Sequence, residues 1–193
     1  MIPCMGDLLL FAADYHNGIL DSAEDALVDV GERIEHPRAN RSFVHIGIVI
    51  SDTQYAQEDG TAHISLLSNI LPTQRVYVKR LALTEEQRFR VPMAAKQYLG
   101  EKYDWGLDVS LGVRYLSNGI FRGIEDITHG FIRLPQSHFA YASHDSLICS
   151  TFVRKVLVEA HYPVKKRYPS PEYFALLPGD MEPMTLPIAS STI

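Results

Sequence analysis

Cys149 is the residue of this chain whose position most readily suggests covalent chemistry. It stands at the start of a segment with helical spacing, shortly after the polar residues 143–146. A thiol at a helix N-terminus lies at the positive end of the helix dipole, which favours the nucleophilic thiolate. The backbone amides of the same turn are suited to stabilising an oxyanion. Most free cysteines are small buried side chains without a chemical role, so position alone leaves both interpretations open.

Two histidines lie in segments that predict neighbouring strands. His45 interrupts the apolar, β-branched segment 43–50, where an unpaired buried imidazole would be costly. It is therefore either a hydrogen-bonded core residue or a residue with a function. An Asp-Gly turn signal at 58–60 would bring His63 beside it in a hairpin, where His63 would fix the tautomer and orientation of His45. Ser65, on the same strand face as His63, is the alternative for that role.

The other histidines give no comparable pattern. His138 and His144 are six positions apart, without the neighbouring acidic ligands at helical spacing that would indicate a metal site. His144 is an alternative base for Cys149, although closeness in sequence does not establish the geometry. The chain contains neither a phosphate-binding loop nor a dinucleotide fingerprint. The sequence therefore predicts no metal and no cofactor.

Composition sets the scale for these candidates. The chain has 193 residues, of which 46% are hydrophobic, enough for the core of one domain over residues 1–193. Its formal net charge of −5 argues against binding nucleic acid through phosphate contacts. With two cysteines, Cys4 and Cys149, it can build neither a disulfide scaffold nor a zinc site of four thiolates. No role follows for Cys4.

The spacing of apolar residues predicts an α+β domain. Short apolar or alternating runs indicate strands, and three segments have helical spacing. Pro92 lies inside the second helical segment and is expected to kink it or delay its regular start. Residues 106–145 have no clear period, and the proline-rich tail is expected to wrap the surface. The predicted strands are 8–12, 43–50, 62–67 and 75–81; the predicted helices begin after Ser22, after Thr84 (with Gln87 in a capping box) and at Cys149.

The chain carries no obvious targeting signal. No apolar run approaches the roughly 20 residues of a membrane span. The N-terminus lacks the basic region and the long apolar region of a signal peptide. We expect a soluble, cytoplasmic protein without a transmembrane segment, and export by a route that needs no signal peptide stays open.

Five short motifs, in this order, resemble the NlpC-like superfamily of papain-fold cysteine peptidases and amidases. They are most similar to its circularly permuted YiiX/YebB-like branch, which is related to lecithin retinol acyltransferase. No single motif is decisive, but together, with the histidine before the cysteine, they are fairly specific and extend from Gly6 to about Leu177. The motifs are Gly-Asp-Leu-Leu-Leu-Phe at 6–11, Val-His-Ile-Gly-Ile-Val at 44–49, Leu-Gly-Glu-Lys-Tyr-Asp at 99–104, Cys-Ser-Thr-Phe-Val at 149–153 and Ser-Pro at 170–171.

The resemblance implies a papain-like fold in which an antiparallel sheet packs against helices, one of which carries the nucleophile. It implies Cys149 as the nucleophile and His45 as the base, with Tyr103 near the active site as a contributor to the oxyanion hole. In the permuted branch the third group is often a glutamate on the strand after the histidine strand. By strand phase, the best match here is His63.

These residues predict a cysteine hydrolase that cleaves an amide or peptide bond, including bonds of bacterial cell-wall peptides, through a thioester on Cys149. A lipid or acyl-ester hydrolase or acyltransferase at the same Cys149–His45 site is one alternative. The expanded stretch between Tyr103 and Cys149 would line an acyl pocket in that case, or merely extend the core. A non-catalytic module that binds a ligand or partner is the other alternative. The expected partners are a peptide, a peptidoglycan fragment or an acyl lipid, and no nucleic acid.

Overall fold

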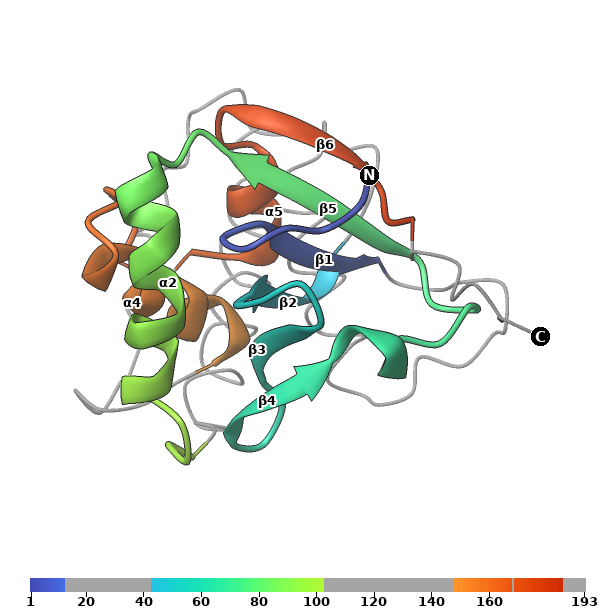
Figure 1. Cartoon of the computed structure of the whole chain (residues 1–193), viewed down its shortest axis with the longest axis horizontal. Coiled ribbons are helices and arrows are strands. Elements are labelled where there is room, and N and C mark those ends of the chain that lie inside the picture. Colours follow the sequence, from blue (N-terminus) through green and yellow to red (C-terminus); the bar gives the residue numbers. More distant parts are fainter. Residues whose placement is uncertain (13–42, 103–147, 168, 186–193) are drawn as a thin grey trace, which may run out of the picture.

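One antiparallel sheet organises the part of the chain that the computed structural model describes, residues 1–12, 43–102, 148–167 and 169–185 (Figure 1). The strand order is β4-β3-β2-β1-β5-β6, and every neighbouring pair is antiparallel. Together with the helices beside it, this sheet makes the described chain an α+β fold, as predicted. The strands are β1 (Leu8–Ala12), β2 (Phe43–Val49), β3 (Gln54–Glu58), β4 (Ala62–Leu66), β5 (Val76–Leu81) and β6 (Gly179–Pro183).

Three described helices contribute side chains to one core cluster on one face of the sheet. α4 contacts β2 and β3, α5 contacts β2, and α2 packs on α4 (Figure 1). No described helix is both long enough and apolar enough to cross a bilayer. The helices are α2 (Glu85–Gln97), α4 (Cys149–Glu159) and α5 (Pro171–Ala175), and a short 3-10 helix, η1 (Leu67–Asn69), follows β4.

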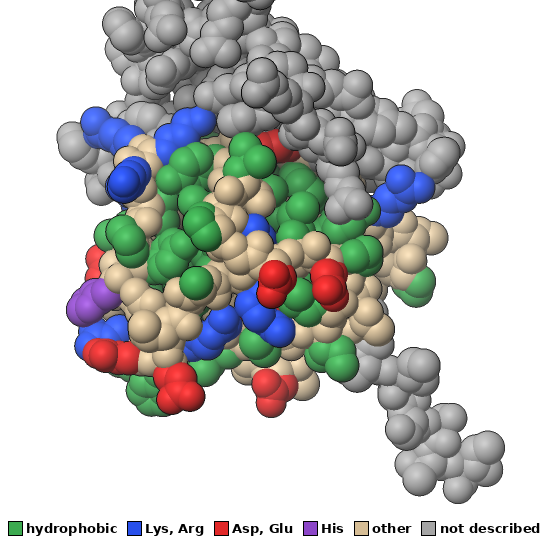
Figure 2. Space-filling view, turned by 90° about the horizontal axis from the view of Figure 1, so that it is seen from above, with side chains coloured by type: hydrophobic (Ala, Val, Ile, Leu, Met, Phe, Trp, Pro, Cys, Tyr) green, Lys and Arg blue, Asp and Glu red, His purple; other side chains and the backbone are tan. Residues whose placement is uncertain are grey.

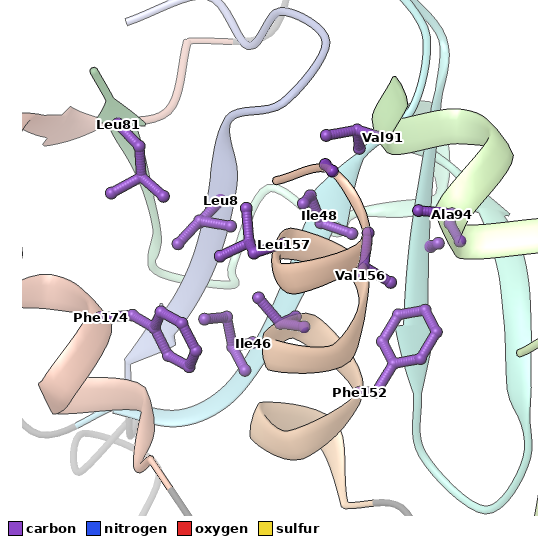
Figure 3. Close-up of a cluster of buried hydrophobic side chains, with 14 of the residues drawn as sticks. Leu8, Ile46, Ile48, Leu81, Val91, Ala94, Phe152, Val156, Leu157 and Phe174 are labelled. Carbon is purple, nitrogen blue, oxygen red and sulfur yellow. The ribbon is translucent and has the colours of Figure 1, made fainter. Parts of the chain in front are cut away.

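The apolar side of α4 forms the centre of the larger core cluster. Its residues Phe152, Val156 and Leu157 are fully buried and pack with Ile46 and Ile48 of β2 (Figure 3). Their spacing of three and four residues is the amphipathic pattern from which the sequence predicted a helix beginning at Cys149, and that helix is confirmed. The nucleophile candidate is thus tied to β2 by the burial of its own helix.

A second, smaller core cluster lies on the opposite face of the sheet. Leu8 and Leu10 of β1 point into the larger cluster, whereas Leu9 points into the smaller one with Val49 and Val78. Because successive side chains of a strand alternate between faces, this division assigns each neighbouring strand residue to one face or the other. We call the two sides of the sheet the helix-covered face and the opposite face.

α2 begins as its sequence predicts. The Thr84 hydroxyl accepts a hydrogen bond from the Gln87 amide, and the Gln87 side chain accepts one from the Thr84 amide, which completes the capping box. Pro92 lies inside the helix, which neither stops there nor begins after it. Gly100, with φ of +85°, follows the helix end in the left-handed conformation that favours glycine.

Two strands differ from the sequence prediction. The strand at 62–66 was expected to pair with β2, but β3 lies between them and pairs with both. β3 escaped prediction because its sequence, Gln-Tyr-Ala-Gln-Glu, is mostly polar although four of its five residues are buried. The end of the proline-rich tail, which was expected to wrap the surface, is exposed but forms a strand that was not predicted, since β6 pairs with β5 at the edge of the sheet.

A buried carboxylate ties the start of the chain to β5 and α2. Asp7 is fully buried, and its oxygens accept hydrogen bonds from Arg80 Nη2 at 2.6 Å and Arg88 Nη1 at 3.3 Å. It also accepts bonds from the Cys4 backbone N–H at 3.0 Å and the Cys4 Sγ at 3.3 Å. The hydrogen bond with Asp7 is the main reason that the pKa of the Arg80 guanidinium is raised. We call these four residues the Asp7 cluster.

The described surface seen from above the view of Figure 1 carries both signs of charge (Figure 2). Figure 2 shows apolar side chains gathered there in patches, with basic and acidic groups interspersed. The described residues on this face therefore do not form the continuous basic surface that is typical of nucleic-acid binding. The predicted helix after Ser22 and the segment 106–145 lie outside the described residues.

Candidate functional site

His45 lies near the beginning of β2, next to an irregularity of the strand. The pairing with β1 matches Phe11 with His45 and then Ala12 with Phe43, so Val44 is an extra residue. A bulge of this kind re-aims the neighbouring side chains. The backbone N–H of Phe43 donates to the buried carboxylate of Glu172 on α5, which anchors the strand at this point.

The imidazole of His45 lies on the opposite face of the sheet. Its ring centroid is 5.3 Å from that of Phe11, its partner on β1, and Phe11 packs against the smaller core cluster with Leu9. Ile46, the next residue along β2, points into the larger cluster instead. Alternation and the ring contact therefore agree on the direction of the His45 side chain.

Gln57 of β3 is the hydrogen-bond partner of His45. The distance between His45 Nε2 and Gln57 Oε1 is 3.0 Å. Gln57 faces Gly47 across the β2–β3 pair and His63 across the β3–β4 pair, which puts its side chain between the two histidines. Only 8% of Gln57 is exposed, so this amide is part of the interior.

The other end of the Gln57 amide contacts β4 and the β3–β4 turn. Gln57 Nε2 lies 3.0 Å from Ser65 Oγ, 3.2 Å from His63 Nε2 and 3.4 Å from Asp59 Oδ2. His63 Nδ1 lies 2.8 Å from the carbonyl oxygen of Thr61. We call the group of His45, Gln57, His63, Ser65 and Asp59 the Gln57 cluster.

Tyr55 closes the Gln57 cluster on the side toward the smaller core. It is 5% exposed, and burial raises the pKa of its phenol, so the hydroxyl keeps its proton. Its ring covers Gly47: a Cβ at position 47 would lie 2.9 Å from Tyr55 Cδ2. The glycine of the Val-His-Ile-Gly-Ile-Val motif thus makes room for the ring next to Gln57.

Cys149 is the first residue of α4, as the sequence predicted. It is 8% exposed and belongs to the larger core cluster with Ile46 and Ile48, on the helix-covered face. The preceding residue, Ile148, has no side chain that could accept a hydrogen bond from the first amides of the helix. Its own N–H donates to Thr151 Oγ1 at 2.8 Å. Neither cysteine of the chain is in a disulfide.

The structure brings two of the three predicted catalytic residues into one cluster and places the third across the strand. His45 and His63 are joined through Gln57, rather than directly as the sequence predicted. Ser65, the alternative to His63, contacts the same amide. Cys149 lies at the beginning of the helix packed on β2, but on the face opposite to His45. Tyr103 lies outside the described residues.

Sequence reasoning missed two polar residues of β3. Gln57 was overlooked together with its strand, although a polar residue on the strand after the histidine strand was the signal to follow. Glu58, its neighbour, is fully buried and pairs with Ala62, whose side chain belongs to the helix-covered face. β3 thus sends an amide to the His45 side and a carboxylate to the Cys149 side. Among the described residues, no three histidine, cysteine or acidic side chains could hold a metal ion.

Comparison of the sequence with known proteins does not identify a related site. No family model and no curated protein matches the chain. Among solved structures, the chain is similar to the crystal structure of metalloprotein yiiX from Escherichia coli O157:H7, DUF1105. The two share 19% sequence identity over 69% of each chain, with a TM-score of 0.39.

Proposed function

We propose that this protein is a cysteine hydrolase with a permuted papain-like fold that cleaves an amide or peptide bond through a thioester on Cys149. The observation that carries the proposal is the hydrogen bond between His45 and the buried amide of Gln57. A cysteine at a helix start and an imidazole held by a neutral amide are the groups that thiol hydrolases combine. The motifs at 44–49 and 149–153 support the same assignment.

The chemistry divides among these residues as follows. The proposal requires the Cys149 thiol to lose its proton to His45, which lies on the opposite face of β2, as the sulfur attacks the substrate carbonyl. The first amides of α4 donate to the oxyanion. His45 then gives that proton to the leaving amine, which leaves an acyl thioester on Cys149. Water attacks the thioester while His45 takes its proton; the carboxylic acid is released, and His45 returns that proton to the Cys149 sulfur. Gln57 holds the imidazole in place throughout.

The experiment compares Cys149→Ala with Cys4→Ser on a panel of peptide amides, cell-wall peptide fragments and acyl esters. Cys149→Ala is expected to reduce turnover to background, whereas Cys4→Ser is expected to keep it. His45→Gln should lose roughly 10²–10⁴-fold, the usual contribution of a general base. Turnover that survives Cys149→Ala would overturn the proposal. Cleavage of esters but not amides would point to the acyl-ester alternative at the same site.

One observation favours a second candidate, a non-catalytic module that binds a ligand or partner. His45 and Cys149 lie on opposite faces of β2. A site that transfers no proton does not need these two side chains to be close together. The reactivity of the thiol distinguishes the two candidates. An activated Cys149 should react with iodoacetamide at about pH 6, well below the usual thiol pKa. If Cys149 reacts no faster than Cys4 and no substrate is turned over, the binding module is the better description.

A further inference from the structure

We propose that a directed chain of hydrogen bonds, running from the Thr61 carbonyl through His63 and Gln57, determines which nitrogen of His45 carries the proton. Each of the three side chains can donate or accept through alternative atoms, so the distances alone do not set the direction. The direction is set at the β4 end of the chain of hydrogen bonds, where the Thr61 carbonyl and the Asp59 carboxylate can only accept. The argument proceeds from there toward His45.

The first step fixes the proton of His63. Its Nδ1 lies 2.8 Å from the backbone oxygen of Thr61 and 3.4 Å from Asp59 Oδ1. A carbonyl oxygen and an ionised carboxylate have no proton to give, so Nδ1 must be the donor. In the neutral imidazole the lone pair is then on Nε2, which faces Gln57.

The second step fixes the orientation of the Gln57 amide. An Nε2 lone pair on His63 accepts from the NH₂ group of Gln57, 3.2 Å away, and would repel its oxygen. Asp59 Oδ2, 3.4 Å from the same nitrogen, also requires a donor there, and Ser65 Oγ at 3.0 Å can accept as well. His63 and Asp59 thus both require that NH₂ points toward β4 and that Oε1 points toward β2, and Ser65 is compatible with this orientation.

The third step reaches His45. Gln57 Oε1 lies 3.0 Å from His45 Nε2, and an amide oxygen only accepts. His45 Nε2 must therefore carry the proton, which leaves the lone pair of the neutral ring on Nδ1. The two histidines at the ends of the amide consequently have opposite tautomers: Nδ1–H in His63 and Nε2–H in His45.

The surrounding backbone holds the start of this chain in place. Thr61 pairs with Lys102 in an isolated bridge, and the Ala62 N–H donates to the Glu101 carbonyl at 2.9 Å. The Gly100 N–H donates to the Ala62 carbonyl at 2.8 Å. These bonds hold the β3–β4 turn against the segment that follows α2. The pairing of β3 with β2 and β4 then fixes where Gln57 lies relative to that turn.

The consequence for catalysis rests on the proposed function. His63 becomes a positioning residue that acts through Gln57, not by direct contact with His45. If His45 is the base, Nδ1 is the ring nitrogen that accepts the proton, and the Nε2–H bond to Gln57 then stabilises the protonated ring. A tautomer with Nδ1–H would have no lone pair for this task.

The test is ¹⁵N NMR of histidine-labelled protein, which separates protonated from unprotonated ring nitrogens. It is carried out in the Cys149→Ala background at about pH 8, where ordinary histidines are neutral. The signals of the two rings are assigned with His45→Gln and His63→Gln. We expect Nε2–H for His45 and Nδ1–H for His63. The opposite tautomer at either ring would overturn the proposal.

Two variants of Gln57 test the direction of the chain. Gln57→Glu offers an acceptor at both ends, so His45 should keep Nε2–H while His63 gains a proton on Nε2. Gln57→Leu removes the link, and the preference of His45 for Nε2–H that Gln57 imposes should then weaken. Ser65→Ala is the matched control, because Asp59 and His63 still orient the amide. His45 should then keep Nε2–H and His63 should keep Nδ1–H. A His63 unaffected by Gln57→Glu would refute the directed chain.

These readouts do not depend on turnover. A protein with the expected tautomers but no hydrolase activity would retain the directed chain and lose the proposed function. A hydrolase with the opposite His45 tautomer would support the proposed function and refute the directed chain.

Discussion

The described structure contains two buried polar clusters that are built on opposite principles. In the Asp7 cluster one carboxylate accepts from two guanidinium groups and from both the amide and the thiol of Cys4. Arginine only donates and a carboxylate only accepts, so the roles in the two ion pairs are set by charge. In the Gln57 cluster, by contrast, the central partners are two imidazoles, an amide and a hydroxyl, each of which has both roles available.

This difference separates anchoring from chemistry. The Asp7 cluster joins the N-terminal segment, β5 and α2, which are distant in sequence. Moving a proton onto Asp7 or off an arginine would break it. The Gln57 cluster joins neighbouring strands that the backbone already holds together, and its protons can be redistributed. Breaking the first should therefore cost stability, whereas changing the second should alter protonation with a smaller effect on folding.

The largest expected effect is that of Asp7→Asn. The substitution keeps the shape of the side chain but removes the charge that both arginines face, and Asp7 itself is fully buried. Losing one partner of a buried ion pair typically costs about 3–5 kcal/mol, and the partial exposure of Arg80 and Arg88 lowers this to roughly 2–4 kcal/mol. Urea unfolding of the variant measures the loss.

Asp52→Asn is the matched control, since Asp52 is exposed. It should change the unfolding free energy by less than about 0.5 kcal/mol, as is usual for surface positions. An Asp7→Asn protein as stable as this control would mean that the cluster does not anchor the fold.

Much of the fold could be predicted because local signals and tertiary packing agree. The capping box at Thr84 and the apolar spacing after Cys149 both produced the expected helices. β3 could not be predicted, since its burial arises from neighbouring strands rather than from its own composition. β6 likewise depends on an open edge of β5, which no pattern within residues 179–183 reveals.

The candidate site was only partly accessible to the sequence for the same reason. His45 and Cys149 could be singled out because each is unusual in its own segment. The contact between His45 and Gln57 joins residues 12 positions apart across a strand pair whose existence was missed. The face on which each side chain lies was equally hidden, because the extra residue Val44 changes the alternation at the start of β2.

Gly47→Ala should disturb the Gln57 cluster with an intermediate effect. The added Cβ would lie 2.9 Å from Tyr55 Cδ2 and 3.1 Å from the Ala56 carbonyl oxygen, so the ring or the strand must move. Overpacking of this kind costs about 1–3 kcal/mol. Displacement of Tyr55 should also change the histidine NMR signals of the cluster, which the Asp7 variant should leave in place.

A double-mutant cycle with Tyr55→Leu checks that the ring is the cause. Removing the ring should relieve most of the cost of Gly47→Ala, so the two effects should be far from additive. Additive effects would place the strain at the Ala56 carbonyl instead.

The smallest expected effect concerns Cys4, measured in the Cys149→Ala background so that it is the only thiol. Burial, the Asp7 charge and the Cys4–Asp7 hydrogen bond all raise the pKa of this thiol, and the two arginines oppose them more weakly. Alkylation by iodoacetamide near pH 9 should therefore be several-fold slower in the folded protein than in urea. Because the folded pKa is the higher one, this contribution to stability is complete below the unfolded thiol pKa and is lost as pH rises through the folded value. Cys4→Ala should remove that alkaline loss, and a thiol that reacts equally fast folded and unfolded would show that Asp7 does not hold its proton.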